Sequence, residues 1–213
     1  MLTLYDYLPS QNAWKVRQIL RHLSIPHQTE LVSIFEGEGQ SASFLAINPW
    51  GAVPAIRLDD GRVLSESNAI LFFLASGTDL LPTDAYRQAK VVQWLSFEAD
   101  YVQTSAGSLR YWTLTEKLKA KPSDVVAAKR ATAARALRIL DKELTTRPFI
   151  AGDDYTIADI SLFAYAHCAP EGGVSTAELS HFQAWLERVR ARPGFLSEMF
   201  PYSIDPHAVA ELP

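Results

Sequence analysis

The hydrophobic pattern of this chain changes once, near residue 77, and that change limits the folds it can adopt. Before it, short segments typical of strands alternate with segments whose apolar residues recur at helical spacing. From residue 85 onward only helical patterns follow. The segment between them, TDLLPTD at 78–84, carries turn-forming residues and is a natural linker. We therefore predict a small α/β domain over 1–77 and an all-helical domain over 85–213.

The first domain is predicted to run in the order strand, helix, strand, loop, strand, strand, helix. A strand begins at Leu2, and apolar residues at i, i+3, i+4 and i+7 from Val16 mark one face of a helix. A second strand is predicted over 28–34. A hairpin is predicted over 55–64, because Asp-Asp-Gly separates two short apolar runs. The segment 65–76 has polar residues at its start and an apolar body, which predicts the last helix.

In the second domain, residues 85–118 predict one long helix or a kinked pair, and residues 123–144 predict another. A further helix is predicted over 156–167. Thr156 and Asp159 have the spacing of a capping box there, with Asp in place of the usual Glu or Gln. We expect Asp159 to stabilise this helix and to take no part in chemistry.

Charge and hydropathy exclude several classes of protein. A formal net charge of −4 over 213 residues argues against nucleic-acid binding, which depends on positive charge. No apolar run approaches the roughly 20 residues of a membrane helix. The first residues, MLTLYDYL, lack the basic segment and apolar core of a secretory signal. We expect a cytoplasmic protein that binds neither nucleic acid nor a membrane.

The cysteine and histidine residues give no sign of a metal site. A single cysteine, Cys168, excludes an intramolecular disulfide and a thiolate zinc site. The five histidines include no pair at the i, i+4 spacing that presents two ligands on one helix face. We therefore predict no metal. Cys168 lies near the end of an apolar helix, and we expect it to be structural.

The segment NPWGAVPAI at 48–56 places a proline at the start of a predicted strand. Proline has no N–H to donate to a sheet, so it is confined to edges, first residues and bulges. In a domain with this order of strands and helices, Pro54 resembles the cis proline of the thioredoxin fold. A trans proline that opens an edge strand is the alternative.

Several segments together resemble the cytosolic glutathione transferase family, specifically its theta-like bacterial, serine-type members. They are YLPSQNAWKVR at 7–17, NPWGAVPAI at 48–56, LSESNAIL at 64–71, QWLSFEADYVQTSAGSLRYW at 93–112 and TIADISLF at 156–163. The resemblance covers nearly the whole chain. It implies an N-terminal thioredoxin-like domain followed by a C-terminal helical bundle, with glutathione as co-substrate.

The resemblance also implies which residues bind glutathione. The backbone of Val53 would pair with the cysteinyl backbone of glutathione, with Pro54 cis. Glu66 and Ser67 would hold the γ-glutamyl end, because a helix N-terminus offers unpaired N–H groups to a carboxylate. Glu66 could pair with the ligand's ammonium group. Ser67 could instead serve only as a helix cap.

At the glycyl end of glutathione this chain departs from the family pattern. Many members carry a longer polar side chain where Ala52 stands. We expect Gln40 or Ser41, in the preceding loop, to replace that side chain.

Three residues are candidates for activating the glutathione sulfur. In serine-type members a serine at the position of Ser10 donates a hydrogen bond to the sulfur. Such a bond favours the thiolate over a thiol whose pKa is otherwise near 8.5. Ser10 could instead be only the N-cap of the following helix, while Asn12 could cap it or itself donate to the sulfur. Tyr7 is the second choice for the donor.

We expect a transferase that conjugates the glutathione thiolate to small hydrophobic electrophiles, with a role in detoxification. The alternatives are another glutathione-dependent enzyme (peroxidase, disulfide reductase, isomerase or dehalogenase) or a non-catalytic binding protein. The absence of a cysteine from the loop at 7–10 argues against branches of the family that react through one. The electrophile pocket is expected to include Tyr7, Leu8, Gln103, Arg110, Tyr111 and Trp112. Arg110 could attract an anionic substrate or form a salt bridge.

The family resemblance further implies a homodimer. Members of the family usually pair the α/β domain of one subunit with the helical domain of the other. The helix at 67–76 and the start of the helix at 85–118 are the expected contributors.

Overall fold

The structure is a computed structural model that describes residues 1–212, and it divides into two compact units. The first comprises Met1–Leu74 together with the segment from Pro193 onward, and the second comprises Ala75–Arg192. We call residues 193–212 the tail. The predicted division had placed the tail in the helical domain. Instead, once the last long helix has ended, the tail packs on the α/β unit.

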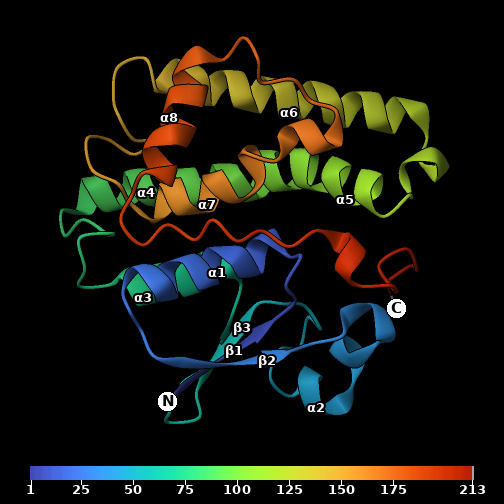
Figure 1. Cartoon of the computed structure of the whole chain (residues 1–213). Coiled ribbons are helices and arrows are strands. Elements are labelled where there is room, and N and C mark those ends of the chain that lie inside the picture. The colour runs from blue at the N-terminus through green and yellow to red at the C-terminus, as the bar shows by residue number, and fades with distance from the viewer. Residues whose placement is uncertain (213) are drawn as a thin grey trace. The chain divides into compact units, whose positions relative to one another are not determined.

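The α/β unit holds a four-stranded sheet in the order β2-β1-β3-β4 (Figure 1). Its strands are β1 (Leu2–Asp6), β2 (His27–Leu31), β3 (Ala55–Arg57) and β4 (Val63–Ser65). β1 pairs parallel with β2 and antiparallel with β3, and β4 is antiparallel to β3. The helices are α1 (Gln11–His22), α2 (Ala42–Leu45) and α3 (Ser67–Ala75), with the 3₁₀ turns η1 (Ile34–Glu36) and η2 (Glu38–Gln40). This is the thioredoxin-like arrangement that the sequence predicted.

The core of this unit joins one face of the sheet to α1 and α3. β1, β3, α1 and α3 each contribute buried apolar side chains, as the helical and strand periods predicted. The buried cluster comprises Leu2, Leu4, Val16, Leu20, Ile56 and Ile70. Burial of each such side chain contributes roughly 1.5–3 kcal/mol, and this packing fixes α1 against β1.

The tail is held on α1 by hydrogen bonds to its backbone. Trp14 Nε1 donates to the carbonyl of Leu196 at 3.1 Å. The Gln18 amide donates to Gly194 O at 3.2 Å and accepts from the N–H of Leu196 at 2.7 Å. Trp14 and Gln18 are one helical turn apart, so they lie on one face of α1. Two buried side chains therefore satisfy the backbone of an otherwise irregular segment.

The second unit is helical. Its helices are α4 (Ala85–Phe97), the π-helical segment η3 (Glu98–Gly107), α5 (Ser108–Leu114), α6 (Ser123–Glu143), α7 (Ile157–Ala166) and α8 (Ser180–Arg190). The short turns η4 (Leu118–Ala120) and η5 (Ala169–Gly172) join them, and a further turn, η6 (Tyr202–Ile204), lies in the tail. Among residues 1–212, no helix has the length and apolar character needed to cross a membrane.

The segment 85–118, predicted as one long helix or a kinked pair, is helical to residue 114 and contains a ten-residue π-helix. Side-chain hydroxyls in and beside this segment bond back to carbonyls four residues earlier. Thr104 donates to Asp100 O at 2.5 Å, Ser108 donates to Thr104 O at 2.9 Å, and Ser105 donates to Tyr101 O. Hydroxyls that occupy these carbonyls compete with the ordinary helical N–H donors. These bonds accompany the widened helix.

The capping box predicted at 156–159 is present. Asp159 Oδ2 accepts from Thr156 N at 3.0 Å, while its Oδ1 accepts from Ile150 N at 2.9 Å and from Trp185 Nε1 at 2.8 Å. The side chain is fully buried. Burial raises the pKa of Asp159 to about 6, despite hydrogen bonds that favour the ionised form. One carboxyl group therefore caps α7 and ties it to α8 and the preceding loop.

We predict that Asp159→Ala lowers the free energy of unfolding by about 2 kcal/mol or more. A lost cap costs about 1 kcal/mol, and here two further buried donors lose their acceptor. The melting temperature should fall by roughly 4–8 °C, with kinetic constants of the surviving protein little changed. Asp84, an exposed N-cap that accepts from Arg87 N at 2.9 Å, provides the matched control. Asp84→Ala should cost only about 1 kcal/mol.

The pH dependence gives an independent check of the same prediction. The pKa of Asp159 in the folded state lies above its unfolded value, so wild-type stability falls as the pH rises through about 6. Between pH 5 and 7.5, wild type should lose about 1.4 kcal/mol that Asp159→Ala does not lose. A normal melting temperature with lost turnover would show that Asp159 acts in the chemistry.

Candidate functional site

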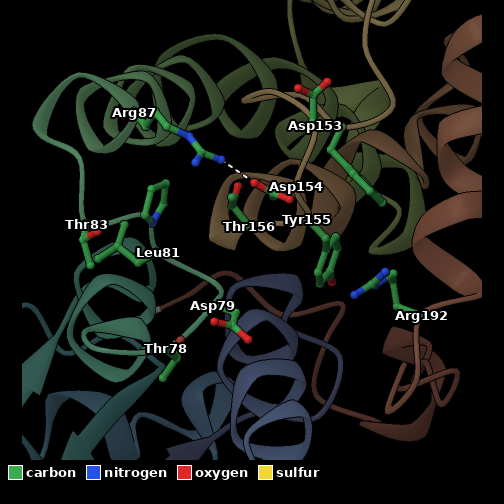
Figure 2. A pocket seen from close by; sticks show the side chains of 12 residues that line it. Thr78, Asp79, Leu81, Thr83, Arg87, Asp153, Asp154, Tyr155, Thr156 and Arg192 are labelled. Carbon is green, nitrogen blue, oxygen red and sulfur yellow. Dashed lines mark hydrogen bonds and ion pairs between the residues drawn. The ribbon is translucent and has the colours of Figure 1, made fainter.

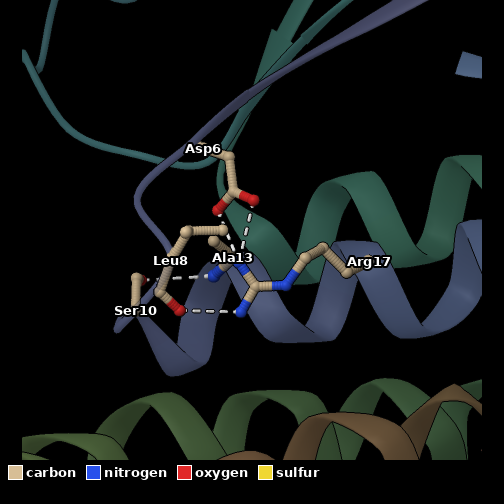
Figure 3. A network of polar contacts seen from close by, with 5 residues as sticks. All are labelled: Asp6, Leu8, Ser10, Ala13 and Arg17. Atoms are coloured by element: carbon tan, nitrogen blue, oxygen red, sulfur yellow. Dashed lines mark hydrogen bonds and ion pairs between the residues drawn. The ribbon is translucent and has the colours of Figure 1, made fainter. Parts of the chain in front are cut away.

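The loop between β1 and α1 carries Ser10, the first candidate for the sulfur donor. Ser10 is the N-cap of α1, and its Oγ accepts from Ala13 N at 3.2 Å (Figure 3). A capping hydroxyl uses its oxygen as acceptor and keeps its hydrogen available for donation. The two roles that the sequence left open for Ser10 are therefore compatible.

A buried ion pair holds this loop in place. Arg17 Nη1 lies 2.8 Å from both carboxylate oxygens of Asp6, and its Nη2 donates to Leu8 O at 2.9 Å (Figure 3). Asp6 is fully buried at the end of β1, and the Arg17 side chain is 12% exposed. The guanidinium also lies over the ring of Phe200 in the tail, 5.7 Å from its centre. Sequence analysis missed this pair, because the two residues belong to different elements.

Asn12, Lys15 and Ser67 form a second polar group, where α1 meets the start of α3. Ser67 Oγ donates to Asn12 Oδ1 at 3.2 Å, and Lys15 Nζ lies 3.5 Å from Ser67 Oγ. Asn12 therefore does not cap α1, which was one of its two predicted roles. Sequence analysis did not single out Lys15.

Glu66 precedes α3 in a left-handed backbone conformation, with φ at 69°. For a residue other than glycine this costs of order 1 kcal/mol or more and is common at functional sites. The side chain of Glu66 is exposed, whereas Ser67 is buried. The strained residue Glu66 thus directly precedes Ser67, the first residue of α3 and a member of the polar group with Asn12 and Lys15.

A cavity of about 280 Å³ brings Ser10, Gln40 and Val53 together. Its complete lining is Ser10, Ile34, Gly39, Gln40, Trp50, Gly51, Ala52, Val53 and, from the tail, Tyr202 and Leu212. The peptide bond between Val53 and Pro54 is cis, as predicted. Within residues 1–212, no hydrogen bond engages the backbone N–H or C=O of Val53.

Two residues that line this cavity, Gly39 and Gly51, have no room for a side chain. Gly51 has a φ of +65°, and a Cβ atom there would lie 2.8 Å from Gly39 O and 2.4 Å from Gln40 Nε2. The loop is closed by Asn48, whose amide donates to Ala52 O at 2.6 Å. Ser41 caps α2 with its hydroxyl and is not among the residues that line this cavity. Of the two alternatives for the glycyl end, only Gln40 lines the cavity.

A second cavity in the same unit, of about 410 Å³, is lined by two other residues of this loop that the sequence analysis selected, Tyr7 and Leu8. It is lined by Tyr7, Leu8, Pro9, Leu31, Val32, Ser33, Glu36, Ile204, Asp205, Pro206 and His207. The Tyr7 hydroxyl donates to Asp205 Oδ2 at 2.8 Å, and its ring packs on Phe35 and Tyr202. Since a tyrosine has one hydroxyl hydrogen, this bond favours Ser10 over Tyr7 as sulfur donor.

Both halves of the chain match one family. Residues 9–76 match the description "Glutathione S-transferase, N-terminal domain", and residues 97–193 match "Glutathione S-transferase, C-terminal domain". Glutathione S-transferase 3 of Zea mays is 33% identical over 204 residues, which cover 91% of each chain. The chain belongs to the glutathione S-transferase family.

Other members of the family differ in the activity or ligand that their names give. The disulfide-bond oxidoreductase YfcG of Escherichia coli is 27% identical and covers 91% of this chain and 92% of its own. A glutathione S-transferase structure from Pseudomonas fluorescens has a TM-score of 0.89 at 35% identity, covering 92% of this chain and 97% of its own. A Burkholderia graminis transferase with two glutathione molecules bound has a TM-score of 0.81 at 29% identity, covering 91% and 85%.

The remaining predicted pocket residues of this transferase-family chain lie in the helical unit. Gln103 is in η3, and Arg110 is buried in α5, where its Nε donates to Glu171 Oε2 at 2.6 Å. This placement favours the salt bridge, one of the two roles predicted for Arg110.

The rings of the other two predicted pocket residues in α5 lie beneath lysine side chains. Lys117 lies over the ring of Tyr111, and Lys121 and Lys129 lie over Trp112. The proposed contact of these residues with an electrophile stays a prediction.

A polar cavity of about 480 Å³ lies wholly within the helical unit (Figure 2). None of the predicted site residues lines it. Arg87 pairs with Asp154, Arg192 lies over the rings of Phe149 and Tyr155, and Thr156 caps α7. These side chains are used to hold the unit together.

Residues 1–212 contain no cluster of three or more histidine, cysteine or acidic side chains suited to a metal ion.

Cys168 is buried in the helical unit, and its Sγ donates weakly to Tyr165 O at 3.3 Å. Burial raises the pKa of this thiol to about 12, so it is not a thiolate at neutral pH. Only the thiolate is an effective nucleophile. Cys168, the single cysteine of the sequence, therefore offers no thiolate to the Ser10 site.

We predict that Cys168→Ala leaves glutathione-dependent turnover within about threefold of wild type. The buried thiol acts as a small hydrophobic group, so its loss should affect stability more than rate. Turnover and melting temperature are measured on the same preparation. Abolished activity in a folded variant would contradict this assignment.

Proposed function

We propose that this protein is a glutathione transferase that conjugates the glutathione thiolate to small hydrophobic electrophiles. The observation that carries the proposal is the 280 Å³ cavity, where the Ser10 hydroxyl, the Gln40 side chain and the unbonded backbone of Val53 meet. These are a donor for sulfur, a polar contact for the glycyl end and a peptide partner for the cysteinyl residue. The glutathione bound in the Burkholderia graminis relative supports the choice of ligand.

The γ-glutamyl end of glutathione would lie at the start of α3. The first N–H groups of a helix attract a carboxylate, and the exposed Glu66 offers a partner for an ammonium group. Ser67 would contribute mainly through its backbone N–H, because its hydroxyl hydrogen is donated to Asn12.

The electrophile would occupy the 410 Å³ cavity, which is lined by Tyr7, Leu8 and Pro9 of the loop that carries Ser10. Leu8, Leu31, Val32 and Ile204 give this cavity an apolar character that suits a small hydrophobic molecule. Its polar groups, including Asp205, would orient the substrate. The tail lines both cavities, so it would help to select the second substrate.

Reduction of glutathione mixed disulfides is the second candidate, because a relative of this chain is named a disulfide-bond oxidoreductase. Since Cys168 is buried, such a reaction would use the thiols of glutathione and none from the protein. Turnover of a generic aryl halide in the absence of disulfide reduction supports conjugation. The converse result would support the reductase. Failure to be retained on a glutathione resin would reject both.

We predict that Ser10→Ala reduces conjugation by roughly 10- to 150-fold. The substitution deletes a hydrogen bond to a charged sulfur, worth about 1.5–3 kcal/mol, and each ~1.4 kcal/mol is tenfold in rate. The pKa of the bound thiol, read from the ultraviolet absorbance of the thiolate, should rise. Glutathione affinity at low pH should change less, because the thiol is protonated in both proteins.

Two variants separate the candidate donors. Tyr7→Phe should leave the thiol pKa unchanged, since its hydroxyl is bonded to Asp205, and Asn12→Ala should have an intermediate effect. Ser10→Ala also removes a cap, so its melting temperature is recorded alongside. If Ser10→Ala preserves the thiol pKa while Tyr7→Phe raises it, Ser10 is only a helix cap.

We also propose that the protein is a homodimer. The expected contributors are α3 and α4, which starts the segment 85–118, and they expose large apolar side chains: Phe72, Phe73, Tyr86 and Val92. Exposed apolar groups gathered on particular elements are typical of interaction surfaces.

Light scattering should give twice the monomer mass of 23.7 kDa. Phe73→Glu and Tyr86→Glu should shift the protein toward monomer, because each buries a charge in the interface. Val125→Glu, at a similarly exposed valine on α6, is the control. A concentration-independent monomer in wild type would reject the dimer.

A further inference from the structure

Lys15 is fully buried in α1, which is rare for a lysine and requires partners for its ammonium group. Its Nζ lies 3.5 Å from Ser67 Oγ, at the long end of a hydrogen bond. Ser67 in turn lies 3.2 Å from Asn12 Oδ1. A buried cation, a hydroxyl and an amide therefore form one chain between α1 and the start of α3.

The chemistry of these groups sets the direction of the chain. An ammonium group can only donate, so Ser67 Oγ accepts from Lys15. Ser67 then has one hydrogen to give, and it goes to the oxygen of the Asn12 amide. The Asn12 oxygen is thereby turned toward Ser67, and its two N–H donors are left for another acceptor.

We propose that Lys15 is a positioning residue that orients the Asn12 amide so that its N–H donates to the bound glutathione thiolate beside Ser10. This inference rests on the proposed function. Asn12 is partly exposed in the first turn of α1, two residues beyond Ser10, whose hydroxyl caps that turn. Without the ammonium group, Ser67 could accept from the Asn12 amide, which would let the amide rotate and withdraw its donor.

The test measures the pKa of bound glutathione and the pH profile of conjugation in Lys15→Met and Ser67→Ala. Each variant breaks the chain at a different point, and Ser67→Ala retains the buried charge. Both should raise the thiol pKa by about one unit and lower kcat at pH 6.5 by about tenfold, because the thiolate fraction falls tenfold per unit. The KM for glutathione should change less than about twofold. Above pH 9 the rates should approach wild type.

Three comparisons make the test specific. The double variant should match the single variants, since either one already breaks the chain. Lys117→Met removes another buried lysine, in the helical unit, and should leave the thiol pKa unchanged. If Lys15→Met does not fold, Ser67→Ala still tests the orientation of Asn12, and Asn12→Ala should reproduce its pKa shift.

The outcomes separate this inference from the proposed function. A raised thiol pKa in Lys15→Met but not in Ser67→Ala would mean a bare charge effect and would overturn the hydrogen-bond chain. A raised KM at unchanged thiol pKa would place Asn12 on the γ-glutamyl end, which also overturns it. Wild-type protein that binds no glutathione would instead reject the proposed function.

Discussion

The position of the candidate site depends on the ion pair between Asp6 and Arg17. Asp6 ends β1, Arg17 lies on α1, and the same guanidinium holds the carbonyl of Leu8 and lies over Phe200 of the tail. Strand, helix, loop and tail thus converge on one cation. Removal of one partner from such a pair leaves an uncompensated buried charge, which costs about 3–5 kcal/mol. The loop that carries Ser10 therefore has little freedom to move, and a donor held in place loses little entropy when it meets sulfur.

The tail adds to the α/β unit a segment that lies outside its thioredoxin-like core. Its backbone is satisfied by Trp14 and Gln18 of α1, and its side chains line both cavities beside the loop. Tyr7 connects the two parts, because its hydroxyl donates to Asp205. Tyr202 and Leu212 of the tail line the cavity that contains Ser10, so a substitution in the tail can change the candidate site from outside the loop that carries Ser10.

Features formed by residues that are close in the sequence could be predicted, whereas features that depend on distant residues could not. The strand and helix order, the capping box of Thr156 and Asp159 and the cis peptide before Pro54 come from contiguous patterns or motifs, and the structure confirms them. The docking of the tail could not be predicted, because it depends on hydrogen bonds between residues some 180 positions apart. The π-helix was missed for a different reason. The features that accompany it are hydroxyl groups bonded to carbonyls four residues earlier, which a hydrophobic pattern does not register.

The proposed catalytic arrangement needs no reactive group from the protein. The pKa of the Cys168 thiol is raised by burial, so in the proposed reaction the nucleophile would be the thiol of glutathione. The protein supplies only donors, and two of them lie in the first turn of α1. Ser10 can cap the helix with its oxygen and still donate its hydrogen, and Asn12 has its oxygen held by Ser67. Unpaired N–H groups at the same helix end add a positive field. A thiolate placed there meets fixed dipoles in place of water, which is the condition under which weak donors lower a pKa effectively.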